Sequence, residues 1–307
     1  MKISIVIVTY NSIKWIKNCL ESILESSLTS EIIIIDNYST DNTLDFLKEN
    51  YLEKIRLIES NENIGFGRAN NLGISLSLQL NSDFIFLLNQ DTVIEKETIE
   101  RLLEVSIKSP EFGIISPIHQ DGRKDSLDMS FLYYITRHGK DFISDSILSK
   151  KLKDVYEVEM INAAAWFVPR KTFEIVGGFD PFFFMYGEDD NFCQRVLYHN
   201  LKIGITPRAM IKHYSDNNNS FMFTVGSDKY YEKFLNGIKV KYGNVNSDYY
   251  KKIDKLRLLF LKKAIFNLLK LDFINYQVYK NKYILIDKKS IVDSLLLNRK
   301  MGKKYLE

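Results

Sequence analysis

Ile3-Ser4-Ile5-Val6-Ile7-Val8 opens the chain as a nearly continuous apolar run, and Thr9-Tyr10-Asn11 follows it directly. Apolar residues at successive positions are typical of a strand that is covered on both faces, as in a parallel sheet with helices on either side. Residues 12–26 then carry apolar side chains at helical spacing, which are Trp15, Ile16, Cys19, Leu20 and Ile23. This strand followed by a helix predicts the first unit of an α/β fold.

The same alternation continues through the next hundred residues. Further strands are predicted at 32–35, 55–58, 84–88 and 113–116, and helices at 43–47, 66–80 and 95–108. Strands and helices that alternate with short connections predict a mostly parallel central sheet flanked by helices, with a Rossmann-like nucleotide-binding half. The pattern weakens over residues 120–155, where we expect an irregular loop or lid, and a strand is predicted again at 202–206.

Polar side chains follow four of the predicted strands. They are Thr9-Tyr10-Asn11, Asp36-Asn37-Tyr38-Ser39, the segment 61–65 and Asn89-Gln90-Asp91. One polar strand end is usually a turn or a helix cap. Four of them at the carboxyl edge of a parallel sheet, where ligands bind in such folds, favour a binding site.

A second signal is the segment from Gly177 to Asn191, in which an aromatic, glycine-punctuated loop precedes Glu188, Asp189 and Asp190. A helix over 188–200 places Asp189 on the same face as its apolar residues, so its carboxylate is predicted to point toward the protein body. A helix N-terminus favours the ionised form of an acid. Asp189 is therefore a candidate general base, and the alternative is simple helix capping by the three acids.

Taken together, these segments resemble glycosyltransferase family 2, the inverting enzymes of the A-type glycosyltransferase fold, and in detail its rhamnosyltransferase-like branch. The resemblance covers residues 3–214 and rests on six pieces in order: Ile7-Val8-Thr9-Tyr10-Asn11, Asp36-Asn37-Tyr38-Ser39-Thr40-Asp41, Asn63-Ile64-Gly65-Phe66-Gly67-Arg68-Ala69-Asn70-Asn71-Leu72-Gly73, Leu88-Asn89-Gln90-Asp91-Thr92, Gly177-Gly178-Phe179-Asp180 through Glu188-Asp189, and Pro207-Arg208-Ala209-Met210-Ile211-Lys212-His213.

The resemblance implies a role for each matching residue. The donor, a nucleotide-diphosphate sugar of the dTDP-rhamnose or UDP-hexose type, would contact Thr9, Tyr10, Asn11, Asp36, Asn37, Asn63, Gly65, Phe66, Asn70, Asn89 and Asp91. Asp189 would be the catalytic base, while Glu188 and Trp166 would bind the acceptor. A core position is the alternative for Trp166, as a loop glycine is for Gly65.

The resemblance also implies a divalent metal, Mg²⁺ or Mn²⁺, held by Asp91 and His213. Asn89 stands where the family has the first acid of its Asp-x-Asp motif, so this chain offers fewer protein oxygens to the ion. Asn191 stands where many relatives have a further acid. Many relatives have an arginine at the position of Asn70, whereas this chain has Arg68, and either residue is a candidate to contact the nucleotide.

The net charge of +3 is unevenly distributed. Residues 251–307 carry 15 Lys and Arg against 5 Asp and Glu, or +10, and the remainder carries 27 against 34, or −7. We therefore predict a catalytic domain over 1–226, with a nucleotide-sugar-binding half (1–119) and an acceptor half (120–226), and a basic helical appendage over 227–307. Two interpretations of the appendage are open: packing against protein, including a homodimer, or binding to an anionic membrane surface.

The resemblance implies an inverting glycosyltransferase that extends a glycan in bacterial surface polysaccharide synthesis (O-antigen or capsule), and the basic appendage fits an acceptor that is lipid-linked. No signal-peptide pattern and no apolar run of transmembrane length occurs, so we expect a cytoplasmic protein, peripheral at the inner face of the membrane. Nucleic-acid binding is not expected, because no groove-reading or base-stacking module is present. The alternatives are a non-catalytic sugar-nucleotide-binding protein and a sugar-nucleotidyltransferase; the latter needs a glycine-rich basic loop where Thr9-Tyr10-Asn11-Ser12 stands.

Overall fold

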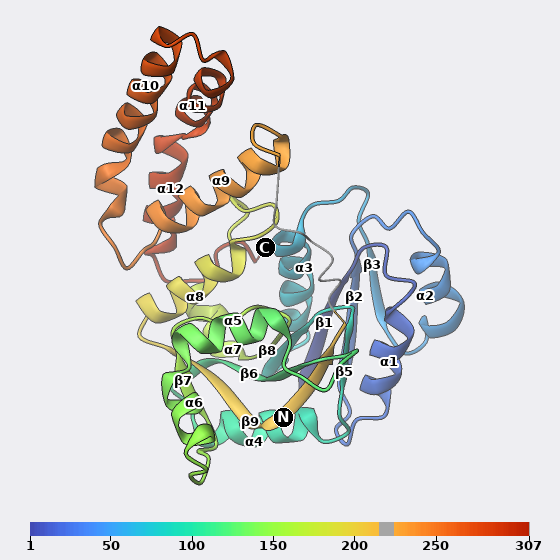
Figure 1. Ribbon diagram of the computed structural model, residues 1–307. Coiled ribbons are helices and arrows are strands. Elements are labelled where there is room, and N and C mark those ends of the chain that lie inside the picture. Colours follow the sequence, from blue (N-terminus) through green and yellow to red (C-terminus); the bar gives the residue numbers. More distant parts are fainter. Residues whose placement is uncertain (215–223, 307) are drawn as a thin grey trace. The chain divides into compact units, whose positions relative to one another are not determined.

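The computed structural model describes residues 1–214 and 224–306. The chain divides into two compact units, one made of Met1–Ser215 with Met301–Glu307 and the other of Asp216–Lys300 (Figure 1). The first unit contains the strands and every residue to which the sequence assigns a site role. The second unit is helical.

The sheet of the first unit joins a parallel half to a mixed half. Its strands are β1 (Ile3–Thr9), β2 (Glu31–Asp36), β3 (Arg56–Glu59), β4 (Phe84–Leu88), β5 (Thr92–Ile94), β6 (Phe112–Asp121), β7 (Tyr156–Val158), β8 (Ala165–Pro169) and β9 (Lys202–His213). The order is β3-β2-β1-β4-β8-β6-β9-β5, and β7 pairs with β9. The first four strands are parallel, whereas β8 runs antiparallel to both of its neighbours.

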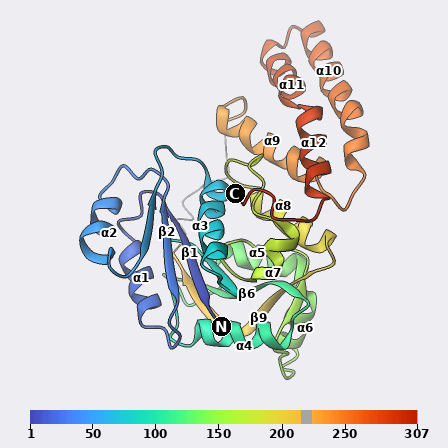
Figure 2. The same ribbon diagram turned by 180° about the vertical axis from the view of Figure 1, so that it is seen from behind.

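Helices cover both faces of this sheet (Figures 1 and 2). One face packs against α3 (Phe66–Gln79), α5 (Met129–His138), α7 (Arg170–Val176) and α8 (Glu188–Tyr198), and the other against α1 (Ile16–Leu24), α2 (Thr43–Tyr51) and α4 (Thr98–Lys108). Successive residues of β1 alternate between the two cores, with Val6 in the first and Ile5 and Ile7 in the second. This is why the opening run of the sequence is apolar at nearly every position.

Two expectations from the sequence need correction. Residues 120–155 are not an irregular loop, because they contain α5 and α6 (Lys140–Ile147). The last predicted strand does not stop at Pro207 but continues to His213, with a register shift between the Pro117 and Ile118 pairings of β6. A bulge of this kind lets a proline lie within a strand, since it relieves the ladder of one hydrogen bond.

The second unit consists of α9 (Asp228–Tyr242), a short 3₁₀ turn (Tyr249–Lys252), α10 (Ile253–Leu269), α11 (Phe273–Leu285) and α12 (Lys288–Asn298). α10 and α11 form a helical hairpin joined by a short turn. Over residues 1–214 and 224–306, none of the helices combines the length and the apolar character that a membrane crossing requires.

The chain then returns to the first unit. Gly302 N donates to Ile175 O at 2.9 Å, and Gly178 N donates to Lys304 O at 2.8 Å. Residues 301–306 thus pack against the start of the loop that leads from α7 to α8. This loop carries the Gly177–Gly187 segment, so the C-terminal residues support the path into the three acids.

Candidate active site

The ends of β1 and β2 are tied together by Asp36. Thr9 Oγ1 donates to Asp36 Oδ1 at 2.9 Å, and Ser39 donates to it through Oγ at 2.6 Å and to Oδ2 through its backbone N–H at 2.9 Å. The Asp36 side chain is buried, with 2% exposure. Most of the acceptor capacity of Asp36 is used by hydrogen bonds within the protein, which fix the turn after β2. Its Oδ2 can accept one further hydrogen bond.

Asn37 and Asn63 connect the end of β2 to the start of α3. Asn37 Nδ2 donates to Asn63 Oδ1 at 3.0 Å, and Asn37 Oδ1 accepts from Ile64 N at 2.9 Å. Asn63 Oδ1 also accepts from Gly65 N at 3.0 Å. Three consecutive polar strand ends of the sequence are therefore one connected network at the carboxyl edge of the sheet.

Gly65 brings the loop before α8 against this network. Its φ is +84°, and an added Cβ would overlap the carbonyl oxygen of Phe184. Two residues later, in the first turn of α3, a Cβ on Gly67 would lie 3.0 Å from Phe179 Cβ and 3.6 Å from Glu188 Cβ. Both glycines permit the loop that precedes the acids to pack closely against the start of α3. Residues 179–188 therefore lie next to the Asn37–Asn63 network.

Tyr10 and Gln90 join the end of β1 to the end of β4. Tyr10 N donates to Gln90 Oε1 at 2.8 Å, and Gln90 Nε2 donates to Tyr10 O at 3.3 Å. Tyr10 is 42% exposed, so a planar ligand could reach its side chain. Next to Gln90, Asn89 N donates to Ala164 O at 2.9 Å and thereby connects β4 to the segment before β8.

Glu188, Asp189 and Asp190 form the first turn of α8, as the sequence predicts. Asp189 Oδ1 accepts from Asp190 N at 2.9 Å, and its carboxylate is also stabilised by the backbone N–H of Ala163. Glu188 Oε2 is buried and has no hydrogen-bond partner among the described residues. A buried oxygen without a partner costs free energy, so this atom is poised for a ligand that donates a hydrogen bond.

Burial raises the pKa of all three carboxyl groups, and repulsion by a neighbouring acid adds to the shift at Glu188 and Asp190. Burial, repulsion by Asp189 and repulsion by Asp190 raise the pKa of Glu188 to about 8, and burial and repulsion by Asp189 raise that of Asp190 to about 7. The pKa of Asp189 is also raised by burial, although backbone N–H groups oppose the shift. The prediction that the helix N-terminus keeps Asp189 fully ionised is thus incomplete, because burial outweighs the helix dipole here.

Asp91 and His213 meet at the ends of β4 and β9. His213 Nε2 lies 3.4 Å from Asp91 Oδ1, and His213 Nδ1 lies 3.3 Å from Asp128 Oδ2. Burial alone would lower the pKa of His213, but the contacts with Asp128 and Asp91 outweigh it and raise the pKa to about 9. Within residues 1–214 and 224–306, no group of three or more His, Cys, Asp or Glu side chains forms a metal cage.

Asp128 is a site residue that the sequence reasoning missed. Its carboxylate caps α5, because Asp128 Oδ1 accepts from Phe131 N at 2.9 Å, while Oδ2 faces His213. An aspartate followed by apolar residues three and seven positions later, here Phe131 and Ile135, is a helix-start signal that was available in the sequence. It was overlooked because only this pair of α5 is buried.

α5 brings the His213 pair and the acid cluster into one region. Its N-cap contacts His213, and Tyr134, nearly two turns later, lies close enough to Asp189 and Asp190 for their charges to raise the pKa of its phenol together with burial. Six residues of helix span about 9 Å. The Asp91–His213 pair and the three acids are therefore connected through α5.

Arg195 holds the start of the loop that leads into α8, and the sequence reasoning did not identify this role. Its guanidinium is completely buried and donates to Val176 O at 3.0 Å, Gly178 O at 2.6 Å and Asn191 Oδ1 at 3.0 Å. Asn191 is thereby turned toward Arg195. The amide at this position thus supports the loop and does not take part in the acid cluster.

Two predicted ligand contacts do not reach a surface. Trp166 has 0% exposure and stacks on Phe179 with ring centroids 6.1 Å apart, so the expectation that it stacks on an acceptor sugar is wrong in this conformation, and it is a core residue. Asn70 is buried in α3 and donates to Phe66 O at 3.0 Å, whereas Arg68 is exposed. Phe66 itself packs against Phe179.

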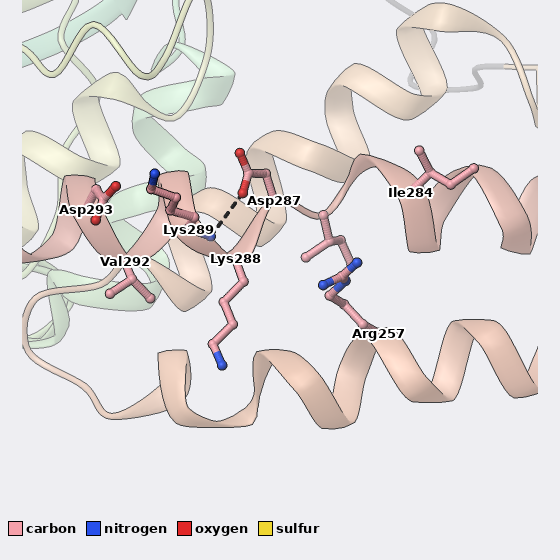
Figure 3. A pocket seen from close by; sticks show the side chains of 8 residues that line it. Arg257, Ile284, Asp287, Lys288, Lys289, Val292 and Asp293 are labelled. Atoms are coloured by element: carbon pink, nitrogen blue, oxygen red, sulfur yellow. Dashed lines mark hydrogen bonds between the residues drawn. The ribbon is translucent and has the colours of Figure 1, made fainter.

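Each of the two units has a surface pocket. One, of about 720 Å³, belongs to the second unit and is lined by residues that include Arg257, Ile284, Asp287 and Lys288 (Figure 3). The other, of about 490 Å³, lies near Met1 at the amino ends of the strands. Neither contains a predicted site residue, so we locate the site by its interacting side chains.

Comparison with known proteins identifies the family of this chain. Residues 4–166 match the family model described as glycosyl transferase family 2, and residues 147–217 match one described as the N-terminal domain of galactosyltransferase. A low-salt glycan biosynthesis hexosyltransferase, Agl10 of Haloferax volcanii, is 30% identical over 208 residues, which cover 66% of this chain and 64% of that protein. The dTDP-rhamnosyl transferase RfbF of Shigella flexneri is 26% identical over 209 residues, which cover 68% of this chain and 67% of that protein.

Solved structures show the same fold at low sequence identity. Staphylococcus aureus TarS 1-349 in complex with UDP has a TM-score of 0.54 at 15% identity, covering 92% of this chain and 91% of that one. GalNAc-T7 with UDP, GalNAc and Mn²⁺ has a TM-score of 0.56 at 14% identity, covering 78% of this chain and 48% of that one. These likenesses show that the α/β unit has the A-type glycosyltransferase fold, and the match over residues 4–166 shows that the chain belongs to glycosyl transferase family 2.

Proposed function

We propose that this protein is an inverting glycosyltransferase that moves a sugar from a nucleotide-diphosphate sugar to a glycan acceptor. The observation that carries the proposal is the first turn of α8, where Asp189 lies beside the buried Glu188 and is connected to the Asp91–His213 pair through α5. A cluster of carboxyl groups with raised pKa values at the edge of a nucleotide-binding sheet is suited to general base catalysis.

Asp189 would act on the acceptor hydroxyl. Its carboxylate takes the proton as the hydroxyl oxygen bonds to the anomeric carbon, on the face opposite the diphosphate. The bond between the anomeric carbon and the diphosphate oxygen breaks, and the diphosphate leaves with the electron pair of that bond. The configuration at the anomeric carbon is therefore inverted. A positioned base of this kind contributes about 10²–10⁴-fold to the rate. The raised pKa makes Asp189 a stronger base once it is ionised, and Glu188, with its unpartnered Oε2, would hold a second acceptor hydroxyl.

The donor would be bound by the network at the ends of β1, β2 and β4. Tyr10 would stack its exposed side chain on the nucleobase of the donor. Asn11, Asn37, Asn63 and Asp36 lie at the same edge of the sheet. A dTDP-rhamnose or UDP-hexose donor is in keeping with the relatives, since one is named a dTDP-rhamnosyl transferase and the TarS structure contains UDP.

Asp91 and His213 would hold a Mg²⁺ or Mn²⁺ ion. Their facing atoms are 3.4 Å apart, and two neighbouring ligands of an octahedral Mg²⁺ ion lie about 3 Å apart, so the pair fits with a small movement. A carboxylate on the far nitrogen of a ligating histidine, here Asp128, is the usual means of fixing its orientation. When bound, the ion supplies positive charge to the departing diphosphate. His213 must lose its proton to bind it.

The acceptor and the location belong to the same proposal. We infer a lipid-linked glycan of a bacterial surface polysaccharide such as O-antigen or capsule, extended at the cytoplasmic face of the membrane. Residues 1–226 would carry the chemistry and residues 227–307 would bind the membrane or a second copy of the chain.

The test combines donor binding with turnover. Thermal shift with dTDP-rhamnose, UDP-glucose and UDP-galactose, with and without Mn²⁺, identifies the donor, because a ligand of the folded form raises the apparent stability. Release of nucleoside diphosphate is then measured with nitrophenyl glycosides as acceptors. Asp189→Asn should bind the donor like the wild type but lose transfer by at least about 10²-fold, whereas the neighbouring control Asp190→Asn keeps most of its activity.

Each alternative has its own signature in these assays. Donor binding without acceptor-dependent release would favour a non-catalytic sugar-nucleotide-binding protein. Formation of a nucleotide sugar from a sugar phosphate and a nucleoside triphosphate would indicate a nucleotidyltransferase. Normal turnover by Asp189→Asn would refute the assignment of the base.

A further inference from the structure

We propose that the turn between α10 and α11 inserts into the headgroup region of an anionic lipid bilayer. We call residues 265–274 the α10–α11 tip. Seven of its ten residues are large, apolar and exposed: Ile265, Phe266, Leu268, Leu269, Leu271, Phe273 and Ile274. Single exposed apolar residues are normal on a protein surface, but a contiguous group of this size marks a contact surface.

The exposure is greatest where the two helices meet. Leu269, Leu271 and Ile274 expose 78%, 73% and 78% of their surface. In contrast, Ala264 and Val278 of the same two helices are buried, so the buried residues of α10 and α11 near this end lie outside the tip. Side chains at a convex turn between two helices can enter a bilayer without unfolding the hairpin.

Basic residues surround the tip on both helices. Lys262 and Lys263 precede it on α10, Lys270 lies within it, and Lys280 follows on α11, and all four are exposed. The one acid in this stretch, Asp272, caps α11 by accepting from Asn275 N at 3.1 Å and from Asn275 Nδ2 at 2.7 Å. Exposed leucines ringed by lysines match an anionic interface, where apolar groups enter the acyl boundary and ammonium groups meet lipid phosphates.

The charge of the second unit argues against a second copy of the chain as the occupant. Residues 251–300 carry 13 Lys and Arg against 4 Asp and Glu, or +9. Apposing two such tips would bring like charges together around the apolar contact, which destabilises the pair. A negatively charged surface relieves this repulsion, and a lipid surface does so without requiring a shaped partner.

Flotation of the full-length protein with vesicles tests the proposal. We expect the protein to float with phosphatidylglycerol vesicles but not with phosphatidylcholine vesicles, and the bound fraction to fall with added salt. The variant Leu269→Ser/Leu271→Ser/Ile274→Ser should lose at least about tenfold in vesicle affinity. The matched control replaces three exposed apolar residues of the first unit: Leu52→Ser/Ile147→Ser/Leu148→Ser.

A second measurement reports the insertion directly. A tryptophan at the tip, Phe273→Trp, should shift its emission to shorter wavelength on phosphatidylglycerol vesicles and be quenched by brominated lipid, whereas Leu296→Trp on α12 should not. Equal flotation of the triple variant and the wild type would overturn the proposal. So would a vesicle-independent dimer that the triple variant abolishes, because it would identify a second copy as the occupant.

Membrane binding rests on the proposed function only in its biological role, which would be to keep the enzyme near a lipid-linked acceptor. Flotation requires no sugar donor, and donor binding by thermal shift requires no vesicle. A failure of one assay therefore leaves the other readable. The triple variant should bind donor like the wild type, because the α10–α11 tip contains none of the candidate site residues.

Discussion

Replacing Glu188 by glutamine should make the protein more stable at neutral pH. Glu188 is buried, its Oε2 has no partner among the described residues, and its pKa rises from 4.5 to about 8. The folded protein therefore keeps a proton at Glu188 that the unfolded chain releases above pH 4.5. It follows that the free energy of unfolding falls as the pH rises from about 4.5 to 8, by up to about 1.4 kcal/mol per pH unit.

The magnitude follows from this window. Between pH 4.5 and pH 7 the full effect would be about 3 kcal/mol. Part of the repulsion belongs to Asp189 and Asp190, which titrate together with Glu188, and a buried glutamine amide brings unpaired groups of its own. We expect Glu188→Gln to gain about 1–2 kcal/mol at pH 7.5 and almost nothing at pH 4.5, with a rise in Tm of about 2–4 °C per kcal/mol.

Urea unfolding followed by tryptophan fluorescence is the appropriate assay. Both tryptophans of the chain, Trp15 and Trp166, lie in the first unit, so their emission reports the unit that contains Glu188. The control is Glu49→Gln, an exposed position on α2 that should leave the pH dependence unchanged. If the free energy of unfolding falls in parallel for Glu188→Gln and the wild type from pH 5 to pH 8, ionisation of Glu188 does not destabilise the folded protein as we expect.

Three further perturbations test the site. Gly65→Ala should destabilise the protein by about 1–3 kcal/mol in urea unfolding, because its φ of +84° and its close packing exclude a side chain. Asp128→Asn should raise the Mn²⁺ concentration needed for half-maximal binding, measured by Mn²⁺ electron paramagnetic resonance, by about 10–100-fold, since it no longer orients His213. Asp190→Asn removes a negative charge beside Asp189, so the pH at which kcat/KM reaches half of its plateau should move to lower values.

Each of these has a result that would contradict it. An unchanged Tm for Gly65→Ala would show that the loop before α8 can move away from α3 at little cost. For Asp128→Asn the control is Asp125→Asn, an exposed acid nearby, and equal Mn²⁺ affinity in both variants would separate Asp128 from metal binding. A pH profile of Asp190→Asn that is unchanged or shifted upward would mean that Asp189 is not the titrating base.

Local sequence patterns were sufficient for the framework of the fold. The β1 run, the helical spacing that follows it and the repetition of this unit predict a sheet covered on both faces, because periodicity records which sides of an element are buried. The same patterns located the start of α8 at Glu188, since acids before an apolar helical stripe are a local signal. The strand order across β4, β8, β6 and β9 could not be predicted, as it depends on pairing between residues far apart in the chain.

The site shows the same division. The residues of the donor network and the acid cluster could be named from the sequence because each follows a strand or starts a helix. The start of α5 has a local signal at Asp128, but its position against β6 depends on contacts between residues far apart in the chain. The sequence therefore did not predict the Asp128–His213 contact or the approach of Tyr134 to Asp189. These two contacts connect the Asp91–His213 pair to the acids of α8.

The sequence by itself determined the alternation of strands and helices, the polar strand ends and the basic character of the last 57 residues, because these are properties of neighbouring residues along the chain. Only the tertiary structure decided that Trp166 is a core residue, that Asp36 is occupied within its own turn and that burial, together with repulsion at Glu188 and Asp190, raises the pKa of the three acids. Burial and electrostatic repulsion depend on what surrounds a side chain in space, and that environment is assembled from segments distant in the chain.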